Sequence, residues 1–132
     1  MNKEIGKVTT KVIELLNLNY ENEIPIYIGD NNINHMVREH PEDFKIYGNQ
    51  IQDIINKPTY VALNPKKYSI EYIKEYKIKN DFVLVAVRAS SNGNMFARTL
   101  FKMTERKKDI YLKKRLCKKI YITCKMNKCM LL

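Results

Sequence analysis

The sequence lacks a long apolar run. No stretch approaches the roughly 18 uninterrupted apolar residues of a membrane-spanning helix, and the opening MNKEIGK has neither the apolar core nor the small-residue cleavage site of a signal peptide. We therefore expect a protein without membrane partners that is made and kept in the cytoplasm. At 132 residues the chain has the usual size of one domain and is too short for two.

Cysteine is scarce, and its positions exclude the usual cysteine-based sites. Cys117, Cys124 and Cys129 all lie near the C-terminus, with no C-x-x-C pair and no histidine nearby. An odd number of cysteines at one end does not build a disulfide framework, and the spacing does not fit zinc. We expect reduced, non-catalytic thiols, no metal and no cofactor.

Acidic residues are scarce in the C-terminal part. Residues 1–101 carry 13 basic and 12 acidic groups, whereas residues 102–132 carry 11 basic and 2 acidic groups of a chain whose net charge is +10. Such a one-sided field favours polyanions by releasing their counterions. It predicts nucleic acid as the partner, with an anionic membrane surface as the second possibility and a merely solvated charged surface as the non-functional one.

The period of the hydrophobic pattern changes halfway along the chain. Three- and four-residue spacing predicts helices over residues 5–18, from Asn31 or Asn32 to His40, and from Glu42 to just before Pro58. A short edge strand is expected over 24–28, between the first two helices. Two-residue alternation then predicts four strands, over 59–64, 69–78, 82–89 and 95–103.

The order of these elements predicts an α+β fold. N-terminal helices should pack on one face of a roughly four-stranded antiparallel sheet and leave the other face open for binding. The basic segment 105–132 should form a helix over Glu105–Leu116, and Lys118–Lys125 can add an edge strand. The whole chain, 1–132, is expected to be a single domain.

An Asn92-Gly93 pair between two apolar runs predicts a β-hairpin with a two-residue turn. In that register Arg88, Ser90 and Thr99 share the open face, whereas Arg98 points to the core. A longer loop or a bulge would shift the register by one residue and turn the other set outward.

Arg88 ends the otherwise apolar run Phe82–Val87. A guanidinium group is not left buried without an anionic or carbonyl partner. Phosphate is one such partner, and a salt bridge to Glu39, Glu71 or another carboxylate is the structural alternative.

The only two histidines, His35 and His40, fall in the sequence HMVREHP. Both can titrate near neutrality, as is needed to take a proton from a ribose 2′-hydroxyl and to return one to the leaving 5′-oxygen. This reaction needs no metal, and the five-residue separation does not fit a helical zinc motif. The purely structural alternative is that one histidine caps the helix break at Pro41 and the other packs under the sheet.

The segment HMVREHPEDF, followed by IINKPTYV and FVLVAVRASSNGNMFARTLFKM, resembles the phage-associated branch of the Barnase–EndoU–colicin–RelE-like (BECR fold) nuclease superfamily. The likeness covers roughly residues 24–104, a nuclease-like core, and leaves 105–132 outside. It implies a helical N-terminal part, a four-stranded antiparallel sheet, and a metal-independent ribonuclease of the kind found in toxins and mobile elements.

The resemblance also implies roles for individual residues. His40 would be the first acid–base group and His35 the second, with Arg88 binding phosphate and Thr99 supplying a hydroxyl. The candidates for binding the substrate are Ser90, Ser91, Arg98, Lys102 and Arg38. Arg98 conflicts with the predicted hairpin register, so either it closes an ion pair at the sheet edge or the turn is longer than two residues.

Three functions are compatible with these features. The first is an RNA endonuclease that leaves a 2′,3′-cyclic phosphate, acting in the host cytoplasm if phage-encoded; a toxin role would bring an inhibitor (antitoxin or immunity) protein as a further partner. The second is a non-catalytic RNA-binding module that stacks bases on Tyr60, Tyr68, Tyr72 and Tyr76. The third is an accessory domain of a larger phage protein.

Overall fold

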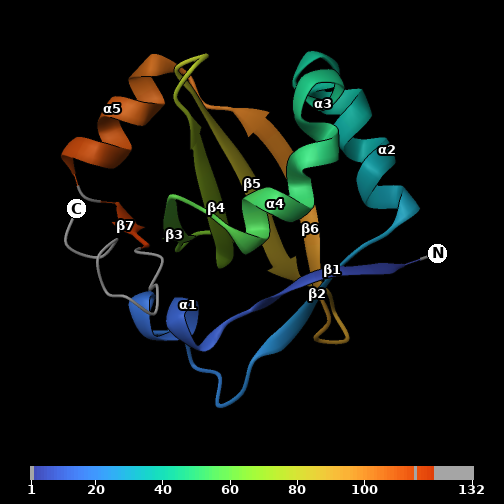
Figure 1. Cartoon of the computed structure of the whole chain (residues 1–132). Coiled ribbons are helices and arrows are strands. Elements are labelled where there is room, and N and C mark those ends of the chain that lie inside the picture. The colour runs from blue at the N-terminus through green and yellow to red at the C-terminus, as the bar shows by residue number, and fades with distance from the viewer. Residues whose placement is uncertain (1, 115, 121–132) are drawn as a thin grey trace, which may run out of the picture.

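A computed structural model describes residues 2–114 and 116–120, which form seven strands and five α-helices (Figure 1). The strands are β1 (Lys3–Val8), β2 (Ile24–Ile28), β3 (Tyr60–Asn64), β4 (Ser69–Tyr76), β5 (Asp81–Ala89), β6 (Met95–Lys102) and β7 (Cys117–Lys119). The helices are α1 (Thr10–Leu15), α2 (Asp30–Glu39), α3 (Pro41–Tyr47), α4 (Ile51–Asn56) and α5 (Glu105–Lys113). None of the described helices is long and apolar enough to cross a membrane.

All seven strands belong to one sheet, in the order β1-β2-β6-β5-β4-β3-β7. The predicted α+β class is confirmed, and the four predicted antiparallel strands are β3 to β6. The expected strand number was too low, because β1 and β2 extend the sheet beyond β6 and β7 extends it beyond β3. β2 was expected at an edge but lies inside the sheet, antiparallel to β1 and parallel to β6.

The helix predicted over residues 5–18 is wrong in its first half, which forms β1. Ile5 and Val8 are both buried although they lie three residues apart. The pairing of β1 with β2 is irregular between Glu4 and Gly6, and such a bulge turns the strand so that residues three apart face the same side. The bulge therefore imitates helical spacing in the sequence.

The two helical regions predicted between residues 31 and 57 are confirmed. The N-cap of α2 is Gly29 rather than either asparagine, and the Asn32 side chain accepts a hydrogen bond from the Gly29 N–H at 2.8 Å. The second helical region is interrupted by a 3₁₀ turn at Gly48–Gln50, which separates α3 from α4. Figure 1 shows α2 and α3 beside β6 at one side of the sheet, with α4 in front of it.

The two faces of the sheet carry separate hydrophobic clusters. The larger joins α4 to alternate residues of the central strands, namely Val83, Val85, Val87, Met95, Ala97 and Leu100. The smaller lies on what we call the second face and joins Phe82 and Leu84 to Tyr111 of α5. The second face is therefore not fully open as predicted, because α5 covers part of it.

The basic helix α5 is part of the fold rather than an appended charged segment. Lys108 is buried, donates from Nζ to the Asn80 carbonyl at 3.2 Å, and lies 5.1 Å from the centre of the Phe82 ring. β7 coincides with the start of the predicted C-terminal edge strand. Residues 121–125 of the predicted strand, which include Cys124, lie outside the described residues, as does Cys129. Burial raises the pKa of the Cys117 thiol.

The predicted two-residue turn between β5 and β6 is wrong. The Ser90 N–H donates to the Asn94 carbonyl at 2.8 Å, which encloses a three-residue loop, and Gly93 supplies the left-handed conformation at φ 90°. A bulge then displaces Arg98, since Ala86 lies opposite Thr99. The longer loop shifts the register by one residue and the bulge shifts it back, so Thr99 keeps its predicted face.

Between the loop and the bulge the faces are the reverse of those predicted. Met95 and Ala97 are buried in the core at 2% and 0% exposure. Phe96 and Arg98 are half-buried, and Phe96 pairs with Arg88 across the strands. The alternative of a longer turn is therefore confirmed, and it places both arginines on the second face.

The buried Tyr72 and the half-buried Tyr111 make stability sensitive to alkaline pH. Burial raises the pKa of Tyr72, and burial together with a hydrogen bond to Glu71 raises the pKa of Tyr111. Unfolded tyrosine ionises at about pH 10. The folded state keeps these protons longer, so their contribution to stability is complete below about pH 10 and is lost as the pH rises toward the folded pKa values.

We expect Tyr72→Phe to maintain or raise the free energy of unfolding at neutral pH by up to about 1 kcal/mol, since its buried hydroxyl has no hydrogen-bond partner in the described chain. Its stability should also fall less steeply above about pH 10. Tyr111→Phe is the matched control and should cost about 1.5–3 kcal/mol, because it removes a 2.6 Å bond to a carboxylate. Urea unfolding of each variant at neutral pH and above about pH 10 measures these effects. A destabilised Tyr72→Phe at neutral pH would contradict the expectation.

Candidate active site

Four basic side chains from three elements line one groove on the second face, near the β5–β6 hairpin. His35 and Arg38 come from α2, Arg88 from β5 and Arg98 from β6, and the groove encloses about 510 Å³. The remaining lining residues are Asn31, Asn32 and Asn34. We call this the arginine groove. No carboxylate is among its lining residues in the described chain, so its net charge favours an anion.

The bulge in β6 determines how Arg98 enters the groove. Its Nη2 donates to the Ala89 carbonyl at 3.2 Å, while its buried Nε has no hydrogen-bond partner among the described residues. Burial and the nearby charge of Arg88 lower the pKa of Arg98. Two guanidinium groups are therefore held together without a compensating acid, a state that a bound anion would relieve.

The salt-bridge alternative for Arg88 is wrong for both glutamates that were considered. Glu39 pairs with Arg38 at 3.4 Å, and Glu71 accepts a hydrogen bond from the Tyr111 hydroxyl at 2.6 Å. Arg98 closes no ion pair at the sheet edge within the described chain, which removes that alternative as well. Neither arginine is neutralised by the acids proposed for it.

His35 lies in the arginine groove as a hydrogen-bond partner of Arg38. Its Nδ1 is 3.3 Å from Nη2 of Arg38. Arginine can only donate, so Nδ1 accepts and the neutral ring carries its proton on Nε2. In this tautomer Nε2 of His35, a lining residue of the groove, is a hydrogen-bond donor.

His40 lies at the junction of α2 and α3 and is not among the lining residues of the arginine groove. Its backbone caps both helices, with the N–H bonded to Met36 and the carbonyl to Phe44. Its half-buried ring lies 5.4 Å from that of Phe101 and makes no hydrogen bond with a described residue. The structural alternative of a capping histidine thus applies to the backbone of His40 and leaves its ring nitrogens available.

A cross-strand row on the second face holds two polar side chains, Thr99 and Glu71, on either side of Ala86. Thr99 lies opposite Ala86, and Ala86 lies opposite Glu71, on three neighbouring strands. Phe101, which contacts His40, is two residues beyond Thr99 on the same face. Lys107 of α5 also reaches this ring, with Nζ 4.9 Å from its centre. His40, at the α2–α3 junction, therefore contacts β6 at Phe101, two residues from Thr99, and the bulged Arg98 adjoins Thr99 in the strand.

Sequence reasoning considered Glu71 only as an ion-pair partner of Arg88. It is 5% exposed and faces the same side of the sheet as Thr99. The strand sequence SIEYIKEY carried the relevant pattern, because Ile70 and Tyr72 point to the larger core and Glu71 must point away from it.

The other predicted residues are only partly brought together. Ser90 lines an adjoining groove with Arg98 and hydrogen-bonds to Asn92 through its hydroxyl. Ser91 is exposed in the hairpin loop and lines neither groove. Lys102 also lines neither groove, and its Nζ lies 3.9 Å from the Asp81 carboxylate.

The expected tyrosine stacking surface is wrong. Tyr72 is buried at 1% exposure, Tyr60 packs on Phe82 with ring centres 6.0 Å apart, and Tyr76 packs on Tyr47 at 4.9 Å. Of the four tyrosines proposed for stacking, Tyr68 alone is largely exposed. They therefore do not form a common platform for bases.

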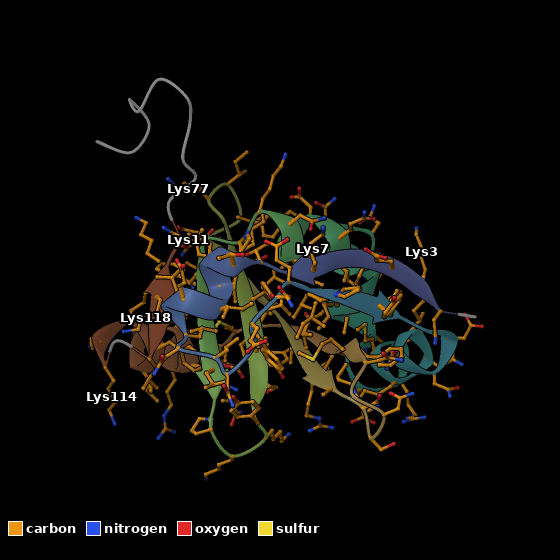
Figure 2. The ribbon with its side chains drawn as sticks, turned by 90° about the horizontal axis from the view of Figure 1, so that it is seen from below. Lys3, Lys7, Lys11, Lys77, Lys114 and Lys118 are labelled. Carbon is orange, nitrogen blue, oxygen red and sulfur yellow. The ribbon has the colours of Figure 1, made fainter. Side chains whose placement is uncertain are left out.

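Lysines extend from several elements of the described chain rather than from its C-terminal part alone. Figure 2 shows labelled lysines extending outward from β1, α1, the β4–β5 turn and the C-terminal elements. They are Lys3, Lys7, Lys11, Lys77, Lys114 and Lys118, all of them exposed. This distributed charge suits non-specific attraction of a polyanion, whereas the arginine groove offers a defined site.

The chain is thus a basic α+β domain with a groove lined by four basic side chains on its sheet. Over residues 3–110 the sequence matches the family described as phage-Barnase-EndoU-ColicinE5/D-RelE like nuclease3. The chain belongs to this nuclease family, which confirms the resemblance seen in the sequence motifs and extends it to β1 and the first turns of α5. No significant match to a curated protein or a solved structure was found.

Proposed function

We propose that the protein is a metal-independent RNA endonuclease of toxin-like character. The observation that carries the proposal is the arginine groove, in which His35, Arg38, Arg88 and Arg98 meet without a lining carboxylate, in a chain of a nuclease family. A phosphodiester is the anion that a nuclease must hold, and guanidinium groups suit its geometry.

The proposed reaction is an internal transphosphorylation. The ribose 2′-oxygen attacks the phosphorus, the bond to the 5′-oxygen breaks, and the products are a 2′,3′-cyclic phosphate and a 5′-hydroxyl. One group takes the proton of the 2′-hydroxyl and another protonates the leaving oxygen. Arg88 and Arg98 would stabilise the negative charge that builds on the phosphate oxygens.

His40 is the proton-transfer group we assign, because its ring nitrogens make no hydrogen bond with described residues and its ring contacts Phe101, two residues from Thr99 on β6. Glu71 is the second titratable group that we assign to this face, in the row that includes Thr99. His35 would donate from Nε2 to a phosphate oxygen, since Arg38 engages its Nδ1.

The test is cleavage of mixed RNA by the purified protein in EDTA. We expect fragments with 2′,3′-cyclic phosphate ends, because the mechanism requires an internal nucleophile and no metal. Strands with 2′-deoxy or 2′-O-methyl sugars should bind with similar affinity and stay intact. Cleavage of the deoxy strand, or cleavage of RNA only after a divalent metal is added, would contradict the mechanism.

A non-catalytic RNA-binding module is the second candidate. It is favoured by one observation, that His40 does not line the groove that contains His35 and the arginines. RNA that binds in a salt-dependent manner yet remains whole in every buffer would support this candidate over the nuclease.

A further inference from the structure

A second groove adjoins the arginine groove and continues it along β6. It encloses about 440 Å³, and it shares Asn31, Asn32 and Arg98 with the arginine groove. Its remaining lining residues are Asn2, Gly29, Asp30, Ser90 and Phe96. We call it the Phe96 groove.

The chemistry of the Phe96 groove differs from that of the arginine groove. Its lining includes one cation, Arg98, and one carboxylate, Asp30, among neutral amides, a hydroxyl and an aromatic ring. One arginine is less suited to a second phosphate than the three that line the arginine groove. A neutral group with a flat face and a polar edge fits this lining better, and a nucleobase is such a group.

Phe96 is held half-exposed by its neighbours on the sheet. It pairs with Tyr27 of β2, with ring centres 6.1 Å apart, and lies opposite Arg88 of β5. The guanidinium carbon of Arg98 is 6.0 Å from the centre of its ring. A partly exposed ring thus stands directly beside the two arginines that we assign to the phosphate.

We propose that Phe96 stacks the nucleobase next to the phosphate held in the arginine groove, which makes single-stranded RNA the substrate class. This inference rests on the proposed function only for the position of that phosphate. A base paired within a duplex cannot present its face to the ring, whereas an unpaired base can. Asn32 is still able to donate to the base edge, because the bond from Gly29 engages only its Oδ1.

The test uses a single-stranded oligonucleotide with 2′-deoxy sugars throughout, so that binding is measured without cleavage. Phe96→Leu should weaken binding of the intact strand about 5- to 150-fold, the equivalent of ~1–3 kcal/mol for one stacked base. A series of strands is then compared, each with a single abasic site at a different position. One strand of the series should bind Phe96→Leu and the unchanged protein almost equally. That coupling locates the stacked base.

Two variants serve as controls. Phe96→Trp keeps a stacking ring and should retain most of the affinity, which separates loss of stacking from loss of packing against Tyr27. Tyr68→Leu removes a more exposed aromatic residue at the β3–β4 turn and should leave binding unchanged. Urea unfolding verifies that each variant is folded at the assay temperature.

Equal weakening by Phe96→Leu on every abasic strand, or equal binding of duplex and single-stranded RNA, would overturn the inference. The outcome is separable from that of the nuclease proposal. Coupling without any RNA cleavage would reject the nuclease and keep the stacking site, whereas cleavage in EDTA without coupling would reject the stacking site alone.

Discussion

His40→Ala is expected to lower the rate of RNA cleavage at saturating substrate by about a hundredfold or more, with nearly unchanged affinity for uncut RNA. Loss of a positioned acid or base acts on the transition state, whereas affinity depends mainly on Arg88, Arg98 and the surrounding lysines. The ring of His40 makes no hydrogen bond with described residues that its removal would break. Single-turnover cleavage and anisotropy of a deoxy strand measure the two effects separately.

His40→Phe is the matched control for packing. It keeps a ring beside Phe101 and preserves the backbone bonds that cap α2 and α3, but it cannot transfer a proton. Its loss of activity should equal that of His40→Ala. The dependence of the cleavage rate on pH that arises from the histidine should also be absent. A fully active His40→Phe would remove His40 from the mechanism.

His35→Ala and Glu71→Gln distinguish the other assigned roles. His35 is expected to act as a donor to phosphate, so its loss should weaken binding and rate together rather than change the pH dependence. Glu71→Gln should change the pH dependence if Glu71 transfers a proton. A Glu71→Gln variant with an unchanged profile would leave that residue a structural partner of Tyr111.

Local pattern was sufficient for most elements of the fold but not for how they assemble. The alternation from residue 59 onward predicted β3 to β6, and Pro41 and Pro58 marked where helical segments break. The parallel pairing of β2 with β6 joins residues far apart in the sequence, and no local period encodes it. The prediction for β1 failed for the opposite reason, because a bulge produced helical spacing within a strand.

The sequence predicted candidate residues for the site but not their arrangement. Arg88 was identified from its place at the end of an apolar run, and the groove confirms that it has partners of like charge. The family resemblance disagreed with the predicted hairpin register over Arg98, and the structure has Arg98 in the groove beside Arg88. Loop length and the bulge determined the outcome, and a sequence read with one ideal register predicts neither. Glu71 was missed as a residue of this face.

Arg88→Ala and Arg98→Ala are expected to lower activity far more than stability. Each variant removes one of two neighbouring cations, so the free energy of unfolding of Arg88→Ala without RNA should stay unchanged or rise. That of Arg98→Ala should fall by about 1 kcal/mol at most, because the bond to the Ala89 carbonyl is also lost. Loss of a donor to the transition-state phosphate should lower the cleavage rate on the order of a hundred- to a thousandfold. Each substitution should also reduce the slope of log K against log salt by about one.

Lysine at the same positions isolates the geometry of the guanidinium group from its charge. Arg88→Lys should restore the salt slope but only part of the rate, because an ammonium group cannot make two parallel bonds to phosphate. Lys67→Ala, at an exposed lysine of the β3–β4 turn, should leave the rate unchanged and serves as the surface control. If Arg88→Ala loses stability and activity in equal measure, the arginine is structural and the groove does not hold the reacting phosphate.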